Sequence, residues 1–288
     1  MTLGDSRTIR IGHSPDPDDA FMFHAMTTGR FDTTPYLYEH ALLDIETLNQ
    51  KALDCEFEVS AVSIHALPDV LGNYVLMNCG ASMGEGYGPR IVTLGEKTLD
   101  QVRNGTIAIP GIKTSAHLAL QIMIGDLNTV VVPFDEIMNE VKAGNVDAGL
   151  IIHEGQLTWK DEGLYLVADL GEMWAQRTGG LPLPLGGNVV RRDLGTEACD
   201  IITEHVRLSI AHAINDPKEG LAFAIEWGRG IDEATNEEFV QMYVNNRTID
   251  YGAEGREAVR RFLKEGQQIG MIRADLNVDA LEFIGSGE

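Results

Sequence analysis

His153 follows an apolar run and could act as a general base. Residues 148–152 read Ala-Gly-Leu-Ile-Ile, which predicts a buried strand, and His153-Glu154-Gly155 come directly after it. Imidazole titrates near neutral pH, and α/β sheets bind ligands at the carboxyl ends of their strands. The position therefore favours proton abstraction by His153, while a buried structural histidine fits the same pattern equally well.

The segment from Pro110 to Ser115 combines hydroxyl groups with a predicted helix start. It joins a predicted strand over residues 106–109 to a predicted helix over 115–124, and the first helical turn contains no acidic residue. Because helix N-termini of this character bind anions, Thr114 and Ser115 are candidate contacts for a substrate carboxylate. The alternative is that these residues only cap the helix.

An acidic loop, Ser-Pro-Asp-Pro-Asp-Asp at residues 14–19, follows the first predicted strand. Either Asp18 or Asp19 is expected to cap the next helix, and the two prolines stiffen the loop. Ser14, Asp16 and Asp19 are candidate contacts for ligand hydroxyls. Capping alone stays open, and so does the less favoured option of a divalent metal site, for which the chain offers no matching ligands elsewhere.

Ser63 ends a fourth candidate segment, Val-Ser-Ala-Val-Ser at residues 59–63. The segment reads as a strand that runs into a helix, so Ser63 could cap that helix or contact a ligand. The chain contains no Gly-x-Ser-x-Gly, Walker, dinucleotide-binding or His-Glu-x-x-His motif. Nucleotide cofactors and hydrolytic triads therefore have no support.

Short β-branched runs alternate with helical patterns through the first two thirds of the chain, which is typical of α/β folds with largely parallel sheets. Predicted strands lie at residues 8–12, 57–62, 74–77, 90–93, 106–109, 130–132, 148–152 and 164–167. Predicted helices in this part lie at residues 19–28, 44–53, 115–124 and 135–143. The remainder is mostly helical, at residues 197–215, 218–227, 236–245 and 254–269, and ends in a packed tail at 273–288.

Two Gly/Pro-rich stretches, residues 84–89 and 179–187, bracket a self-contained α/β pattern. The simplest topology has two lobes joined by two crossovers that form a hinge, with the ligand in the cleft between the lobes. Lobe one comprises residues 1–89 plus 188–288 and includes the C-terminal helices, and lobe two comprises residues 90–187. The alternative is that both stretches are ordinary surface loops.

Acidic residues outnumber basic ones by 44 to 22, which gives a net charge of −22. Such a polyanion repels nucleic acid and anionic membranes, so we expect a small-molecule partner. We also expect the protein to be a monomer or a homodimer. The chain has neither a secretory signal core nor a membrane-length apolar run, which predicts a cytoplasmic protein. Cys55, Cys79 and Cys199 show no zinc or redox spacing.

Several longer runs resemble the menaquinone-biosynthesis family of the futalosine pathway. They include SPDPDDAFMFHA (14–25), IPGIKTSAHL (109–118), AGLIIHEGQLTW (148–159) and DLGEMWAQRTGGLPLPLGGNVVRRDLG (169–195). The resemblance covers nearly the whole chain in the same order. It implies a two-lobed α/β fold like that of type II periplasmic binding proteins, with mixed, mostly parallel sheets.

The resemblance also implies an activity and site residues. The expected enzyme is a cofactor-independent lyase that converts cyclic dehypoxanthinyl futalosine to dihydroxynaphthoate by base-initiated elimination, with no metal. His153 matches the family's catalytic base, and Thr114 and Ser115 match its paired hydroxyl residues. Ala61 and Ser63 match a further substrate-binding segment.

The chain departs from the family in two segments. The best-known members have a lysine in place of Ala61 and a Ser-Pro-Cys-Pro-Asn-Asp loop in place of residues 14–19. Two other classes stay open: a related lyase such as chorismate dehydratase, and a non-catalytic solute-binding or sensor protein of the same fold. The candidates for a cation that faces the substrate carboxylate are Arg90, Lys113 and Arg191.

Overall fold

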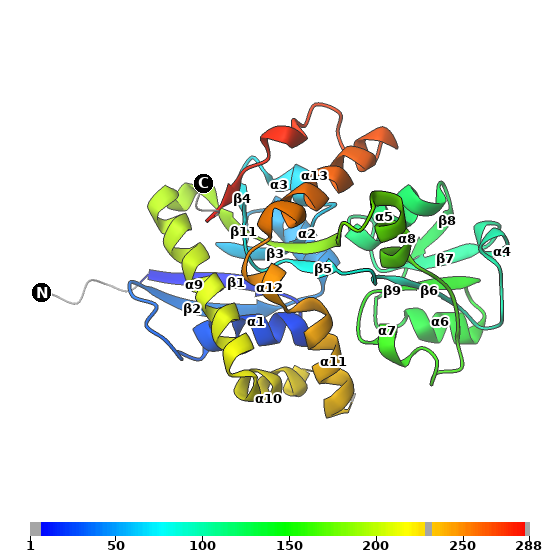
Figure 1. Cartoon of the computed structure of the whole chain (residues 1–288), viewed down its shortest axis with the longest axis horizontal. Coiled ribbons are helices and arrows are strands. Elements are labelled where there is room, and N and C mark those ends of the chain that lie inside the picture. The colour runs from blue at the N-terminus through cyan, green and yellow to red at the C-terminus, as the bar shows by residue number, and fades with distance from the viewer. Residues whose placement is uncertain (1–6, 228–231, 286–288) are drawn as a thin grey trace, which may run out of the picture. The chain divides into compact units, whose positions relative to one another are not determined.

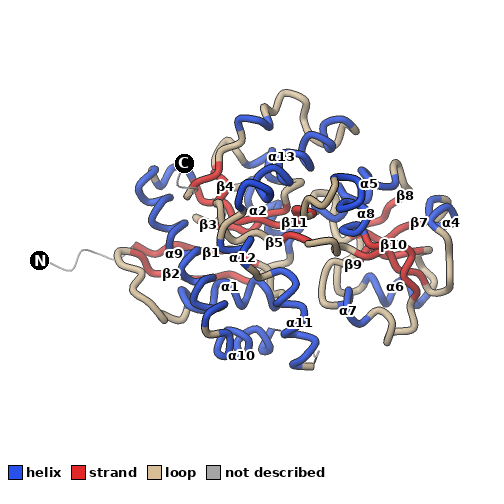
Figure 2. Tube along the Cα trace, viewed as in Figure 1, coloured by secondary structure: helices blue, strands red, loops and turns tan. Residues whose placement is uncertain are grey.

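The computed structural model describes residues 7–227 and 232–285. The chain divides into two compact units, each built from separate chain segments. Unit 1 comprises residues 1–82, 186–252 and 280–288, and unit 2 comprises residues 83–185 and 253–279. Figure 1 traces these segments by colour, and Figure 2 shows that each unit combines strands with surrounding helices.

Unit 1 contains a seven-stranded mixed sheet. Its strands follow the order β12-β4-β11-β3-β1-β2, and β5 pairs with β11 beside this path. β1 runs parallel to β2 and β3, whereas β11 runs antiparallel to β3 and β4. The bounds are β1 (Arg7–His13), β2 (Tyr36–Leu42), β3 (Val59–Ser63), β4 (Tyr74–Met77), β5 (Ser82–Gly84), β11 (Leu183–Arg191) and β12 (Phe283–Ile284).

Apolar side chains hold the helices of unit 1 against this sheet. Gly12 makes a close approach possible, because a Cβ atom there would lie 2.6 Å from Phe57 and 2.8 Å from Leu48 of α2. The larger core contains Ile9, Ile11, Phe21, Phe23, Ile202, Val206 and Ile210. The helices are α1 (Pro17–Thr27), α2 (Ile45–Leu53), α3 (Leu67–Val70), α9 (Thr196–Asn215), α10 (Pro217–Trp227), α11 (Glu233–Tyr243) and α12 (Asn246–Ile249).

Unit 2 contains a five-stranded sheet in the order β10-β6-β9-β7-β8. β7 runs parallel to β8 and β9, and β6 runs antiparallel to β9 and β10. The strands are β6 (Arg90–Thr93), β7 (Thr106–Ile109), β8 (Asn128–Val131), β9 (Ala148–Ile151) and β10 (Tyr165–Asp169). The helices are α4 (Leu99–Arg103), α5 (Ser115–Ile124), α6 (Ile137–Ala143), α7 (Gly155–Thr158), α8 (Leu170–Thr178) and α13 (Gly252–Gln268).

The division between the units differs from the predicted lobes at α13. Residues 253–279 belong to unit 2, whereas the sequence pattern predicts that all C-terminal helices lie in the first lobe. The reason is packing: Phe262 meets Trp174 edge-to-face with ring centroids 5.5 Å apart, and the buried carboxylate of Glu265 binds Arg177 at 2.6 Å. Apolar periodicity shows that α13 has a buried face but not which sheet that face covers.

The second Gly/Pro-rich stretch is also not a simple connecting loop. Residues 183–191 form β11, whose register with β3 includes Gly186 opposite Ser63 and Val190 opposite Val59. Gly187 is required there, since a Cβ atom would lie 2.7 Å from the Tyr251 hydroxyl oxygen. Strand partners on both sides therefore override the turn preference of proline and glycine.

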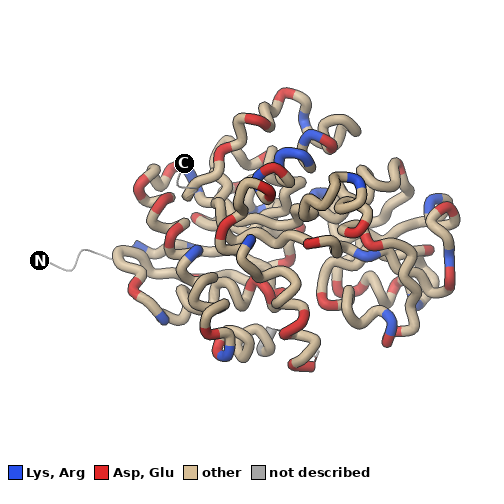
Figure 3. Tube along the Cα trace, viewed as in Figure 1, with Lys and Arg blue, Asp and Glu red and all other residues tan. Residues whose placement is uncertain are grey.

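Charged side chains of both signs occur throughout the described chain, with acidic residues more numerous (Figure 3). None of the helices in residues 7–227 and 232–285 is long and apolar enough to cross a membrane.

Candidate functional site

In unit 2 the structure brings the predicted base and the predicted anion-binding turn to one sheet edge. β7 and β9 are parallel neighbours, with Ala108 opposite Gly149, so their carboxyl ends lie side by side. His153 follows β9, and Thr114 and Ser115 follow β7. This is the edge at which α/β sheets bind ligands.

The His153 ring is buried, with 5% of the residue exposed. Its edge-to-face contact with Phe134 has a ring-centroid distance of 5.7 Å. The Gly155 amide donates a hydrogen bond to Nδ1 at 2.9 Å, and the Glu154 carboxylate oxygen Oε2 lies 3.8 Å from the same nitrogen. A Cβ atom on residue 155 would lie 2.6 Å from Cε1, so only glycine fits against the imidazole.

The Gly155 contact determines the tautomer of His153. A main-chain amide can only donate, so Nδ1 accepts, and the neutral ring then carries its proton on Nε2. In this tautomer Nε2 donates a hydrogen bond and has no lone pair for a substrate proton. For Nε2 to act as a base, Nδ1 must be protonated and directed at an acceptor, and the Glu154 carboxylate is within a small movement.

Arg90 fixes the short helix that follows His153. Its guanidinium pairs with Asp169 at 3.1 Å and donates from Nη1 to the main-chain oxygen of Gln156 in α7. The Asp169 side chain also caps α8 through the amides of Gly171 and Glu172. Arg90 is thus committed to the protein scaffold, and sequence reasoning gave no sign of this role because its partners lie far along the chain.

The two hydroxyl residues at the start of α5 have protein partners. Thr114 is the N-cap: its hydroxyl donates to the Gly111 oxygen at 2.8 Å and accepts from the His117 amide at 3.3 Å. Ser115 donates to the Leu185 oxygen at 2.5 Å. Because both hydroxyl protons are used, an anion here would be held by main-chain amides and the helix dipole.

In unit 1 the acidic loop has a different capping geometry from the predicted one. Asp16, not Asp18 or Asp19, is the N-cap, because Pro17 takes the first helical position that suits its fixed φ angle. Asp19 accepts the Ser14 amide at 2.8 Å, and Asp18 accepts the Ser82 hydroxyl at 3.1 Å. A hydrogen bond within the loop and another to Ser82 therefore hold its conformation.

Burial changes the ionisation of the loop. It raises the pKa of the Asp18 carboxyl to about 7, with the nearby Asp16 charge adding to the effect. Burial and the Asp18 charge likewise raise the pKa of Asp19 well above its usual value. His13, which stacks on Phe23 with ring centroids 4.8 Å apart, has its pKa lowered to about 3 by burial and so stays neutral. A carboxyl group with a raised pKa is a frequent property of functional sites.

Ser63 lies at the same edge of the unit 1 sheet as the acidic loop, because Ser63 ends β3 and the loop follows β1, its parallel neighbour. Its amide donates to Asn49 Oδ1 at 2.8 Å, and Asn49 Nδ2 donates back to its hydroxyl at 3.1 Å. Asn49 comes from the buried face of α2 and was not predicted. Ala61 is 6% exposed and sits opposite Asn188 of β11, which donates to the Gly80 oxygen at 2.9 Å.

The candidate cation Arg191 lies at the opposite end of β11 from these residues. It lies at the last position of β11, whereas Gly186, opposite Ser63, lies five residues earlier in the strand. Its guanidinium binds Glu58 and Asp193. The structure thus separates Arg191 from Ser14, Asp19 and Ser63 within unit 1.

Comparison with known proteins shows the family of this chain. Residues 9–268 match the family described as menaquinone biosynthesis. A 1,4-dihydroxy-6-naphthoate synthase of Streptomyces coelicolor is 37% identical over 282 residues, which is 96% of this chain and 98% of that protein. The synthase of the same name from Thermus thermophilus is 37% identical over 263 residues, 91% of this chain and 95% of that protein.

Two solved structures extend the comparison. A structural-genomics protein from Archaeoglobus fulgidus is 42% identical with a TM-score of 0.87, covering 92% of this chain and 98% of that chain. The alkanesulfonate-binding protein SsuA from Xanthomonas axonopodis is only 11% identical but has a TM-score of 0.71, covering 96% of this chain and 98% of that chain. The second likeness concerns the fold alone, and it confirms the predicted periplasmic-binding-protein-like α/β architecture.

Proposed function

Because the chain belongs to the menaquinone biosynthesis family, we propose that this enzyme of menaquinone biosynthesis is a 1,4-dihydroxy-6-naphthoate synthase. Its substrate is then cyclic dehypoxanthinyl futalosine. The reaction is a base-initiated elimination in which the electron pair of the broken C–H bond expels the sugar-derived fragment, and it uses no cofactor. The observation that supports this most is that His153 and the start of α5 follow β9 and β7, which are adjacent parallel strands of the unit 2 sheet. One group can remove a proton there while the other binds a carboxylate.

The proposal gives each part of the site a role. His153 removes the acidic C–H proton next to the substrate ketone, and the helix start at Thr114 and Ser115 binds the substrate carboxylate through main-chain amides of the first turn of α5. Ser14, Asp16, Asp19, Ala61 and Ser63 contact the ribose-derived part of the substrate. Asp18 and Asn49 hold this set in place through Ser82 and Ser63 respectively.

A product assay tests the proposal directly. Purified protein incubated with cyclic dehypoxanthinyl futalosine is expected to release 1,4-dihydroxy-6-naphthoate, detected by mass spectrometry. Chorismate is the control substrate, since its dehydration would identify the related lyase. Saturable binding of the futalosine compound with no product would identify a solute-binding protein and contradict the proposed reaction.

Glu154 has a specific role in this mechanism. When Nε2 of His153 takes the substrate proton, Nδ1 must carry its own proton, and we expect Glu154 Oε2 to accept it. Replacing Glu154→Gln is therefore expected to lower kcat about tenfold with little change in KM, since a charge-assisted hydrogen bond to the base is lost. The acidic limb of the kcat/KM profile should also move to lower pH, because an anionic neighbour stabilises the imidazolium ion.

Glu172→Gln, at an exposed position on α8, is the matched control and should retain the wild-type profile. An unchanged kcat and an unchanged acidic limb in Glu154→Gln would exclude Glu154 as the partner of Nδ1. That result would leave the product assay intact, so the two tests are independent.

A further inference from the structure

A cavity of about 510 Å³ lies in unit 1 away from the candidate substrate residues. Its lining residues are Cys55, Gly72, Asn73, Arg191, Arg192 and Asp193. Ser63 and Gly186 pair at one end of β3 and β11, whereas Val59 and Val190 pair at the other end, next to the cavity. The cavity is in the size range of small-molecule sites and at the opposite edge of the same sheet.

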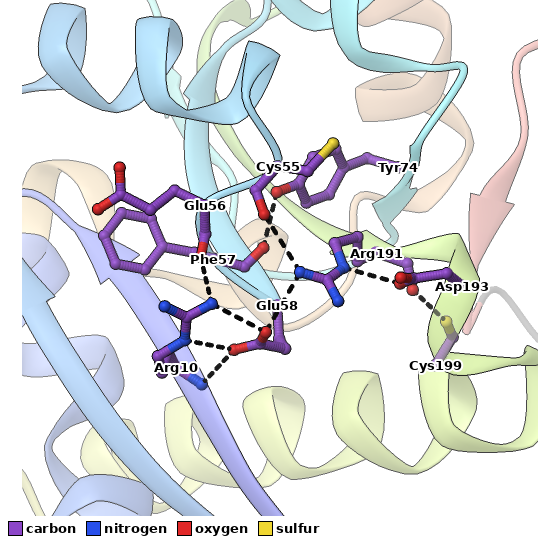
Figure 4. Close-up of polar contacts among 9 residues, drawn as sticks. All are labelled: Arg10, Cys55, Glu56, Phe57, Glu58, Tyr74, Arg191, Asp193 and Cys199. Atoms are coloured by element: carbon purple, nitrogen blue, oxygen red, sulfur yellow. Dashed lines mark hydrogen bonds and ion pairs between the residues drawn. The ribbon is translucent and has the colours of Figure 1, made fainter.

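Arg191 lines this cavity, and polar contacts with neighbouring residues hold its guanidinium group (Figure 4). Its Nε donates to Asp193 at 2.7 Å, and its Nη1 donates to the Cys55 main-chain oxygen at 3.1 Å and to Glu58 at 3.2 Å. Glu58 is itself fixed by Arg10, whose Nε binds it at 3.0 Å. The guanidinium is therefore pre-oriented, which lowers the entropy that ligand binding would cost.

Arg192 is held in a similar way. Its Nε donates to the Tyr74 oxygen at 2.8 Å and to the Leu71 oxygen at 3.2 Å, and its Nη1 pairs with Glu282 at 2.9 Å. In the described ranges, neither Arg192 nor Arg191 uses its Nη2 group in a hydrogen bond to protein. The groups that remain available on the two arginines are therefore N–H donors, and neither side chain offers an acceptor.

Excess donors on two fixed guanidinium groups match a ligand that carries an oxyanion. The carboxylates of Glu58, Asp193 and Glu282 balance the charge of the two arginines, so the preference for an oxyanion depends on the two Nη2 donors rather than on a net positive charge. Screening limits the wider negative field to about 8–10 Å at ordinary ionic strength, so the near groups decide the local preference. We propose that this cavity is a second binding site, for a small metabolite bearing a carboxylate or phosphate group.

Cys55 supplies a reporter for this site. It lines the cavity and is partly exposed, with its backbone at φ 55°. The other two cysteines are buried, and burial raises the pKa of the Cys79 thiol to about 12 and that of Cys199 above its usual value. Alkylation of the native protein should therefore occur at Cys55 alone among the cysteines.

Inorganic phosphate is the probe for a direct titration followed by nitrogen-15 NMR, with sodium chloride at equal ionic strength as the reference. We expect saturable shifts of the amides of residues 72–73 and 191–193 in the wild-type protein. Arg192→Gln should weaken phosphate binding about tenfold, because one charge-assisted contact is lost. Arg207→Gln is the matched control, since its side chain is 38% exposed against 37% for Arg192 and is also ion-paired.

A second measurement compares the rates at which anionic iodoacetate and neutral iodoacetamide alkylate Cys55. In both reactions the thiolate sulfur bonds to the methylene carbon and displaces iodide. The rate ratio of iodoacetate to iodoacetamide should fall several-fold in Arg192→Gln and stay unchanged in Arg207→Gln. Absence of saturable shifts in the wild-type protein would overturn the proposal whatever the thiol rates. Equal phosphate affinity in the two variants would overturn it as well.

Discussion

Replacing His153→Ala is expected to lower kcat about 10²–10⁴-fold while KM stays within a few-fold, because a general base acts on the transition state more than on substrate binding. His153→Gln should behave alike, since it keeps much of the side-chain volume but cannot take a proton. The measurement is steady-state formation of 1,4-dihydroxy-6-naphthoate from cyclic dehypoxanthinyl futalosine.

His212→Ala, on α9 in unit 1, removes a histidine outside the proposed site and should leave both constants near the wild-type values. Near-normal kcat in both His153 variants would remove the residue from the role of base. A large increase in KM with an unchanged kcat would instead make His153 a substrate-binding group.

Asp18→Asn is expected to stabilise the protein by about 1–3 kcal/mol at about pH 8. Burial raises the pKa of Asp18 to about 7, against about 3.9 in an unfolded chain. The folded state therefore binds this proton more tightly than the unfolded state. The resulting stability is fully present below about pH 4 and is lost as the pH rises through about 7. Asparagine avoids the ionisation and can still accept the Ser82 hydroxyl.

Urea unfolding at several pH values measures this effect. The difference between Asp18→Asn and the wild-type protein should shrink as the pH falls toward about 4. Asp200→Asn, an exposed change of the same charge in unit 1, controls for the overall negative charge and should show no such pH dependence. A stability difference that is the same at about pH 5 and pH 8 would contradict a raised pKa at Asp18.

Much of the strand pattern could be predicted, because buried strands such as β7 and β9 carry continuous apolar runs. β2 escaped prediction since it is an edge strand whose Glu39 and His40 interrupt the apolar pattern. β11 was not predicted as a strand because its proline and two glycines are typical of turns. In both cases the strand depends on partners that are distant in the sequence.

The candidate site shows the same limit. His153, Thr114 and Ser63 could be selected because each follows or ends a predicted strand, where local sequence is informative. The groups that position them could not, since Asn49 reaches Ser63 across 14 residues and Arg90 reaches α7 across 66. The tautomer of His153 was equally hidden, because it depends on the direction of one amide two residues later.

The composition of unit 2 from two chain segments decides how the protein can be dissected genetically. A fragment that ends at residue 185 would lack Phe262 and Glu265, and would leave Trp174 and Arg177 without these partners. Expressing this half alone would require residues 253–279 to be supplied in trans or fused through a linker. A truncated variant that loses activity would therefore have lost the folding of unit 2, and the loss would not identify the residues that carry out the reaction.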